Sequence, residues 1–224
     1  MSLAQRNAPS AASALPPPVA GVLREALPAF ATNVALALVY AGFAVTHLAL
    51  ARETGRWAEL LPVVTQETVL VGLFVVRRRA VVTSQRPLDW LAGGLGTFLP
   101  LLLLATPERS GLDPAGWVLQ SLGLGLALLS LVALGRSIGV VAADRGLKTG
   151  GLYRVVRHPA YAAYLLTYTG FTLTYPSAWN VLVTAATAGL MVARALAEER
   201  CLAANPGYCA YRRRVPWRFA PYLF

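Results

Sequence analysis

Long uncharged stretches of apolar residues fill most of the sequence, and polar residues gather in the segments between them. Four such stretches cover residues 26–51, 60–76, 90–107 and 114–135, and a fifth covers residues 159–193; the stretch 60–76 is weaker, because Glu67 lies near its middle. A helix needs about 20 apolar residues to cross the ~30 Å hydrocarbon core of a bilayer. An amphipathic soluble protein would instead alternate apolar and polar positions with a period of about 3.6 or 2 residues. The pattern therefore predicts an all-α integral membrane protein.

The fifth stretch is too long for one straight membrane helix. Its 35 residues would measure roughly 52 Å at about 1.5 Å per residue, well beyond the hydrocarbon thickness. Pro176 interrupts the stretch, because proline cannot continue the helical hydrogen-bond ladder and the residue before it avoids helical backbone angles. We therefore expect a C-terminal helical hairpin with halves of about 16 residues. Together with the four earlier stretches, this gives about six hydrophobic helices.

The basic residues predict how these helices are oriented. With the N-terminus inside, the inner segments hold seventeen lysines and arginines, and the outer loops hold three, Arg52, Arg56 and Arg109. Cytosolic segments of membrane proteins carry such an excess of positive charge. We therefore expect both termini in the cytosol. The Ala/Arg/Leu-rich composition has a bacterial character, so the expected location is a bacterial inner membrane.

The net charge and the two cysteines bear on two further classes of function, nucleic-acid binding and metal binding. The net charge is +10, but these charges lie mostly at the ends of apolar stretches, where topology explains them, so no nucleic-acid partner is expected. Cys201 and Cys209 lack the companion ligands of a zinc site, and no metal is expected. The chain divides into three parts: a disordered Ala/Pro/Ser-rich tail over residues 1–25, a four-helix transmembrane region over 26–135, and a C-terminal core over 136–224.

Polar chemistry concentrates in two inner segments, residues 146–161 and 194–221, on either side of the hairpin. Because the hairpin returns to the same face, these segments must lie close together and could form a pocket open to cytosol and lipid. Taken one at a time, the polar residues have simpler explanations. His158 could precede a proline-initiated helix, Arg194 and Glu198 could form a surface ion pair, and the tyrosines could belong to an interfacial belt. The glycines of residues 93–96 favour close helix packing, because they lack the strand-turn-helix setting of a dinucleotide loop.

The combination of these residues is more specific than its parts. The pattern consists of Gly151 and Tyr153, Arg157-His158-Pro159 and Tyr161, Arg194 with Glu198-Glu199 and Leu202, and finally Tyr208 and Tyr211. It resembles the isoprenylcysteine carboxyl methyltransferase family and, more distantly, the membrane phospholipid methyltransferases. The resemblance covers residues 147–221, about a third of the chain. It departs from the family at Ala163, where a glycine is usual, and in a slightly shorter segment between Leu202 and Tyr208.

The resemblance implies S-adenosylmethionine as the methyl donor and a pocket at the cytosolic face. The residues that it implies for cofactor binding are Lys148, Tyr153, Arg157, His158, Pro159, Tyr161 and Glu198. Arg194 and Glu199 are expected at the reacting end, where Arg194 could hold a carboxylate and Glu199 could assist an amine. Positions five apart on a helix point about 140° apart. Arg194 therefore shares a face more naturally with Glu198 than with Glu199.

The acceptor is expected to be lipophilic or small and hydrophobic, and to enter from the lipid bilayer. Carboxylate O-methylation is favoured, and N-methylation of a lipid amine or S-methylation of a thiol remains open. Two hypotheses of a different class are a membrane reductase related to the sterol reductases and a non-catalytic membrane protein. Glu67 lies in the middle of an apolar stretch, where a carboxylate is costly, so it needs a polar partner such as Gln66 or His47, or it lines a substrate path.

Overall fold

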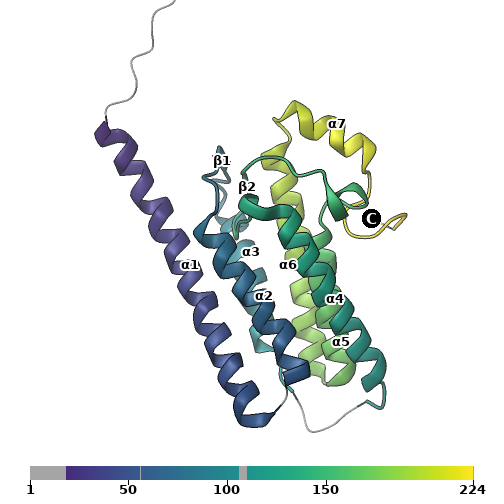
Figure 1. Ribbon diagram of the computed structural model, residues 1–224. Helices are drawn as coiled ribbons and strands as arrows, with labels where there is room; N and C mark the ends of the chain where they lie inside the picture. The colour runs from purple at the N-terminus through teal and green to yellow at the C-terminus, as the bar shows by residue number, and fades with distance from the viewer. Residues whose placement is uncertain (1–18, 56, 106–109, 224) are drawn as a thin grey trace, which may run out of the picture.

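The computed structural model describes residues 19–55, 57–105 and 110–223. Its helices follow one another with little other structure (Figure 1). They are α1 (Val19–Thr54), α2 (Trp57–Val75), α3 (Pro87–Phe98), α4 (Asp113–Leu134), α5 (Pro159–Thr174), α6 (Ala178–Leu202) and α7 (Pro206–Arg214). The 3-10 turns η1 (Leu99–Leu102), η2 (Gly135–Ser137) and η3 (Gly151–Arg154) extend or connect them. The expected tail, residues 1–25, lies mostly outside the described residues, and its last seven residues are part of α1.

The all-α membrane architecture predicted from the hydrophobic pattern is confirmed. Within the described residues, three helical segments are long and apolar enough to cross a membrane, Phe30–Thr54, Asp113–Ser137 and Ala178–Leu202. Val63–Val75 is a shorter apolar helix. The total number of full spans stays a prediction.

The predicted C-terminal hairpin is present, and its second helix is longer than expected. Residues 175–177 separate α5 from α6, and the Ser177 side chain caps α6 by accepting a hydrogen bond from the Asn180 backbone N–H at 3.0 Å. The fully buried Asn180 amide also donates to the carbonyls of Leu104 and Tyr175 at this turn. Helix α6 then continues for 25 residues, so that Arg194, Glu198 and Glu199 all lie within it.

Small residues let α4 and α5 pack closely. A Cβ added to Gly123 would lie 2.8 Å from the Ala163 carbonyl oxygen, and one added to Gly170 would lie 2.6 Å from the Gly116 carbonyl oxygen. Both distances are too short for any side chain, so these positions require glycine. Glycine also matters in α3, where a Cβ at Gly93 would lie 2.7 Å from the Val140 carbonyl oxygen. The close packing expected for residues 93–96 is therefore confirmed.

Helix α1 packs along α2, and a partly buried polar pair joins them. His47 Nδ1 lies 3.0 Å from Glu67 Oε1 and 3.1 Å from Oε2. His47 is one of the two partners expected for this carboxylate, and the pair explains how Glu67 is accommodated in an apolar helix.

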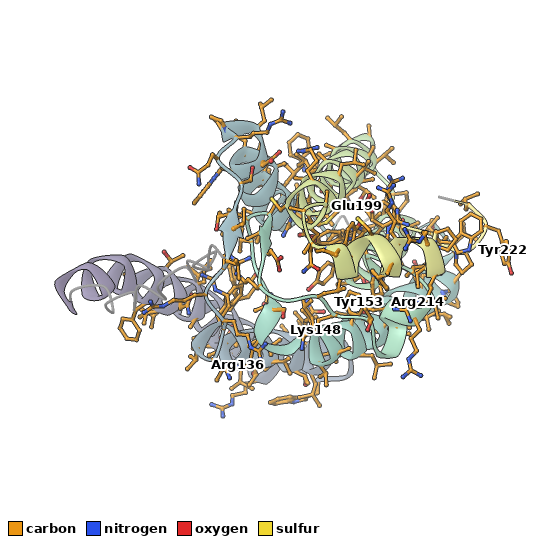
Figure 2. All side chains as sticks on the ribbon, turned by 90° about the horizontal axis from the view of Figure 1, so that it is seen from above. Arg136, Lys148, Tyr153, Glu199, Arg214 and Tyr222 are labelled. Atoms are coloured by element: carbon orange, nitrogen blue, oxygen red, sulfur yellow. The ribbon has the colours of Figure 1, made fainter. Side chains whose placement is uncertain are left out.

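Most of the polar structure gathers at one end of the helices, which we call the α7 end (Figure 1). It contains α7, η3 and the antiparallel pair of β1 (Val82–Thr83) with β2 (Ala143–Asp144). The start of α1 and the C-terminal segment lie at this same end. Seen from this end, Lys148, Tyr153 and Glu199 lie near the middle of the helices, and α1 lies to one side (Figure 2).

Candidate active site

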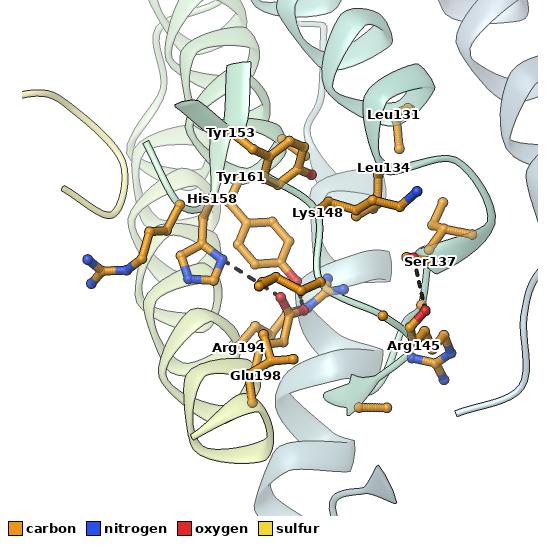
Figure 3. A pocket seen from close by; sticks show the side chains of 18 of the residues that line it. Leu131, Leu134, Ser137, Arg145, Lys148, Tyr153, His158, Tyr161, Arg194 and Glu198 are labelled. Carbon is orange, nitrogen blue, oxygen red and sulfur yellow. Dashed lines mark hydrogen bonds and ion pairs between the residues drawn. The ribbon is translucent and has the colours of Figure 1, made fainter. Parts of the chain in front are cut away.

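A pocket lies at the α7 end, between α4, α5, α6, α7 and the loop that follows α4 (Figure 3). It is partly open to solvent, and the space between its lining residues that no atom fills, open solvent included, amounts to about 1030 Å³. Its polar and aromatic lining residues are Phe74, Ser137, Arg145, Lys148, Tyr153, Arg157, His158, Tyr161, Tyr164, Arg194, Glu198, Tyr208 and Tyr211. The two polar segments on either side of the hairpin therefore meet in one pocket.

His158 and Tyr161, at the start of α5, line the pocket together. Pro159 begins the helix, and the His158 side chain makes no capping hydrogen bond, so its ring is available to the pocket. The ring stacks on Tyr161 with 5.7 Å between centroids, and its Nδ1 lies 3.7 Å from Glu198 Oε2. The Tyr161 hydroxyl donates a hydrogen bond to the other Glu198 oxygen. His158 thus both precedes a proline-initiated helix and forms part of a polar wall, and these two explanations do not exclude each other.

Arg194 lies on the same face of α6 as Glu198, one helical turn nearer the start of that helix. Its guanidinium is 5.0 Å from the centre of the Tyr161 ring and donates to Thr97 Oγ1 at 3.2 Å and to the Val140 carbonyl at 3.1 Å. The residue is only 8% exposed. The hypothesis of a surface ion pair between Arg194 and Glu198 is therefore wrong, and their expected shared face is confirmed.

Glu199 lies on another side of α6 and is absent from the pocket lining. One of its oxygens, Oε1, accepts hydrogen bonds from Arg157 Nε at 2.9 Å and Arg218 Nε at 3.1 Å, and lies 3.2 Å from His158 Nε2. Because α6 is continuous here, the angular separation expected from Arg194 is retained. Glu199 joins the start of α5 to the C-terminal segment and is not brought together with Arg194.

Arg157 and Pro159, both predicted to bind the cofactor, have structural roles in the backbone around the pocket. Arg157 Nη1 donates to the carbonyls of Val215 and Pro216, and the Arg157 backbone N–H donates to the carbonyl of Trp217. Arg157 lines the pocket while its guanidinium is engaged by these carbonyls and by Glu199. Pro159 starts α5 and is not a lining residue.

Lys148 and Tyr153 supply donors on the α4 side of the pocket (Figure 3). Burial raises the pKa of Tyr153 well above its ordinary value, with smaller contributions from Glu198 and Tyr211. The Tyr153 side chain is therefore a neutral hydroxyl at physiological pH. Its backbone carbonyl accepts a hydrogen bond from the Tyr211 hydroxyl at 2.7 Å, which attaches α7 to η3.

Arg145 lines the pocket but was not predicted from the sequence. Its guanidinium packs against Gly139 and donates to the Val141 carbonyl at 3.4 Å. Desolvation lowers its pKa, and the Glu198 carboxylate opposes that shift. The polar segment recognised in the sequence begins one residue later, at Gly146. The basic character of Arg145 was visible, but nothing in the pattern showed that the loop folds back over the helices.

Unpartnered polar atoms gather in this pocket. In the part of the chain that the structure describes, three buried side-chain atoms of lining residues lack a hydrogen-bond partner: Arg145 Nε, Arg194 Nε and the Tyr208 hydroxyl oxygen. Buried polar groups are normally paired, so unpaired donors in a cavity suit a polar ligand. No cluster of three metal-ligating side chains is found among the described residues. The pocket fits an organic ligand that carries both anionic and cationic groups.

Known proteins of three kinds are similar to this chain: a sequence family, a curated relative and a solved structure. Residues 114–205 match the sequence model of the phospholipid methyltransferase family. Methanethiol S-methyltransferase 2 of Bradyrhizobium diazoefficiens is 26% identical over 194 residues, which cover 81% of this chain and 70% of that protein. A solved structure of the eukaryotic intramembrane Ras methyltransferase, an isoprenylcysteine carboxyl methyltransferase, has a TM-score of 0.49 at 18% identity and covers 92% of this chain and 86% of its own.

The family match spans the helices α4, α5 and α6 that carry most of the pocket. It begins at the second residue of α4 and ends three residues after α6, so it also includes His158, Arg194 and Glu198. The chain is therefore similar, over these helices, to the phospholipid methyltransferases and, over most of its length, to a thiol methyltransferase, and the resemblance predicted from its motifs is confirmed.

Proposed function

We propose that the protein transfers a methyl group from S-adenosylmethionine to a small or lipophilic acceptor that is anionic at the reacting atom. The observation that carries this proposal is the buried Arg194, which lines the pocket beyond Glu198 and has no carboxylate ion-pair partner among the described residues. Arg194 is a fixed positive charge on the side of the pocket that faces the interior of the helices. Glu198 is the negative charge on the same face of α6, one helical turn nearer the α7 end.

The pocket residues match the groups of the proposed donor. Lys148, Arg145 and the neutral Tyr153 hydroxyl would hold its carboxylate, and Glu198, kept in place by Tyr161, would hold its ammonium or its ribose hydroxyls. His158 and Tyr161 form a stacked aromatic wall for the adenine or the ribose. When bound, S-adenosylmethionine supplies an electrophilic methyl group on a sulfonium. The remaining task of the protein is to align the acceptor and exclude water, which can lower a barrier by up to ~7–11 kcal/mol in favourable cases.

The charge of Arg194 discriminates among acceptors. A thiolate or a carboxylate is stabilised beside a guanidinium, whereas methylation of a neutral amine develops positive charge there and is disfavoured. A thiol acceptor first releases its proton to water, and its pKa is lowered by the neighbouring cation. With Arg194 holding the thiolate, the bound donor would supply the methyl group, and the products would be a neutral thioether and S-adenosylhomocysteine.

We place thiols first among the acceptors because the relative from Bradyrhizobium diazoefficiens is named as a methanethiol S-methyltransferase. A carboxylate, the acceptor favoured by the sequence motifs, is the second candidate. The planar fork of Arg194 supports it, since a guanidinium can bind both carboxylate oxygens. The acceptor would reach Arg194 from the bilayer and the donor would enter from the cytosol, with the α7 end at the cytosolic face of a bacterial inner membrane.

Calorimetry with S-adenosylhomocysteine on detergent-purified protein tests the cofactor site. We expect binding by the wild type, loss of binding in His158→Ala and in Glu198→Ala, and no change in the control Glu53→Ala, whose side chain is exposed at the far end of α1. No binding by a well-folded wild type, or binding of a nicotinamide cofactor in its place, would contradict the proposal. Binding of the nicotinamide would favour the hypothesis of a membrane reductase.

Methyl-transfer assays with matched acceptors test the reacting end. We expect transfer from labelled S-adenosylmethionine to an alkyl thiol, weaker transfer to an alkyl carboxylate and none to an alkyl amine of the same length. Arg194→Gln should abolish transfer to the thiol while S-adenosylhomocysteine still binds, because Arg194 faces the acceptor. Preferential transfer to the amine would refute the assignment of an anionic acceptor, and the cofactor site would remain a separate question.

A further inference from the structure

A second cavity lies at the α7 end, beside α1 and α2 and apart from the candidate active site. Its polar and aromatic lining residues are Thr32, Asn33, Arg77, Arg78, Arg79, Thr83, Trp90 and Arg145. Only Val141 and Arg145 line both cavities, so they form a shared wall. The run of arginines at 77–79 was explained in the sequence by membrane topology alone. Topology accounts for the side of the membrane on which they lie, but not for their position around a cavity.

The lining contains four arginines and no aspartate or glutamate. In the described part of the chain, none of the four forms an ion pair with a carboxylate. Arg77 is half-buried, with its guanidinium 5.6 Å from the centre of the Phe74 ring. Burial, together with the neighbouring charge of Arg145, lowers the pKa of Arg77 to about 10. Cations that are partly desolvated and close to one another are costly unless an anion joins them.

One unpartnered buried donor adds to this observation. Arg145 Nε lacks a hydrogen-bond partner within the described residues, and Arg145 lines the second cavity. Paired guanidinium donors match the oxygens of a phosphate. The charge and the donor set therefore point to the same class of ligand.

We propose that this cavity, the arginine pocket, binds a phosphate group, in the first place the phosphodiester of an anionic phospholipid. The surroundings favour a lipid over a free phosphate. Leu36 of α1 is an apolar lining residue of the cavity, and Leu91 of α3, which follows the lining residue Trp90, is an exposed apolar side chain along which an acyl chain would lie. Trp90 is 54% exposed and donates its indole N–H to the Ser84 carbonyl, an arrangement typical of a membrane–water interface. The bound lipid is a ligand of the fold and not the methyl acceptor.

The chain offers a matched control for a test of this site. Arg212, Arg213 and Arg214 on α7 are also three consecutive arginines at the α7 end, but they line no part of the arginine pocket. We compare the wild type, a variant with Arg77, Arg78 and Arg79 changed to Gln, and a variant with Arg212, Arg213 and Arg214 changed to Gln. Each full-length protein in neutral detergent is titrated with phosphatidylglycerol, phosphatidylcholine or inorganic phosphate, and the unfolding temperature is recorded.

We expect phosphatidylglycerol to stabilise the wild type and the α7 variant with similar apparent affinity. The pocket variant should lose roughly tenfold or more in that affinity, because it loses charge-assisted hydrogen bonds to the phosphate. Phosphatidylcholine should act weakly on all three proteins. Equal losses in both variants would overturn the proposal, since non-specific surface attraction would then explain the binding. Stabilisation by inorganic phosphate alone, lost only in the pocket variant, would retain the phosphate site and overturn its assignment to a lipid.

If the pocket variant with glutamines does not fold, the corresponding Arg→Lys triple variants replace both proteins. Lysine retains the charge and removes the planar fork, so the same contrast between the two positions is expected with a smaller loss of affinity. Identical binding by the two lysine variants and the wild type would show that geometry does not contribute, and would overturn a built phosphate site. None of these measurements depends on methyl transfer.

Discussion

The two neighbouring glutamates on α6 have different surroundings and should have different roles. Glu198 lines the candidate active site and is in contact with Tyr161 and His158. Glu199 is nearly buried and gathers three donors, from Arg157, Arg218 and His158, on one oxygen. One residue therefore faces a ligand, and the other holds together the backbone segments that shape the pocket.

This difference gives a paired prediction. Glu198→Gln should weaken the binding of S-adenosylhomocysteine by about tenfold, through loss of a charge-assisted hydrogen bond, with little change in unfolding temperature. Glu199→Gln should lower stability by about 3–5 kcal/mol, because it leaves buried cations without their counter-charge. Calorimetry and thermal unfolding of the two variants in the same detergent check both effects. An unchanged stability of Glu199→Gln would contradict its role as an anchor of the backbone.

At the scale of elements, the interface of α4 and α5 depends on glycine. A Cβ at Gly123 would lie 2.7 Å from the Thr167 backbone nitrogen, while one at Gly125 on the same helix would meet nothing within 4 Å. We expect Gly123→Val to destabilise the protein by about 3 kcal/mol by forcing the helices apart. Gly125→Val should change stability by less than about 1 kcal/mol. Denaturant titration of the two variants distinguishes them, and equal effects would argue against this close packing.

The attachment of α7 to η3 predicts a response to alkaline pH. Burial raises the pKa of Tyr211 to about 12 and raises that of Tyr153 and Tyr208 as well. The folded protein therefore keeps protons that the unfolded chain releases above pH ~10, the ordinary pKa of tyrosine. Stability should be unaffected by these groups below pH ~10 and should fall above it, by about 1 kcal/mol per pH unit for each tyrosine.

Thermal unfolding between pH 8 and 11, beside Tyr211→Phe, measures this effect. The variant lacks the hydrogen bond to the Tyr153 carbonyl and should be less stable at neutral pH, but its decline at alkaline pH should be shallower because one titrating group is gone. Parallel curves for the two proteins would show that Tyr211 does not contribute to the decline.

Element order was largely predictable from the sequence, because the lengths of apolar stretches and a single proline determine where membrane helices can begin and end. The structure at the end of α6 could not be predicted from the sequence in this way. Its charged residues belong to a polar segment without an apolar pattern, yet Glu199 is held among three donors and Arg194 is buried behind Tyr161. Helix periodicity did predict that Arg194 and Glu198 share a face. Arg145 could not be found this way, because a fold-back of the loop over Gly139 has no periodic signal.

At the scale of the whole molecule, both cavities open at the same end of the helices as the start of α1, α7 and the C-terminal segment. The excess of arginine at this end predicts that it faces the cytosol. This orientation matters for the proposed reaction, since a charged methyl donor is available only on that side. It also matters for the arginine pocket, because anionic lipid of the cytosolic leaflet attracts basic segments.

The two free thiols provide a direct test of this orientation. Cys209 is exposed on α7, and Cys201 is partly buried near the end of α6. In the variant Cys201→Ala, a membrane-impermeant maleimide should label Cys209 in inverted membrane vesicles and leave it unlabelled in intact cells. In a chain lacking both native thiols, Glu53→Cys, at the other end of α1, should show the reverse pattern. Labelling of Cys209 from outside intact cells would place both cavities on the wrong side for a cytosolic donor, and the proposed methyl transfer would then have no access to its cofactor.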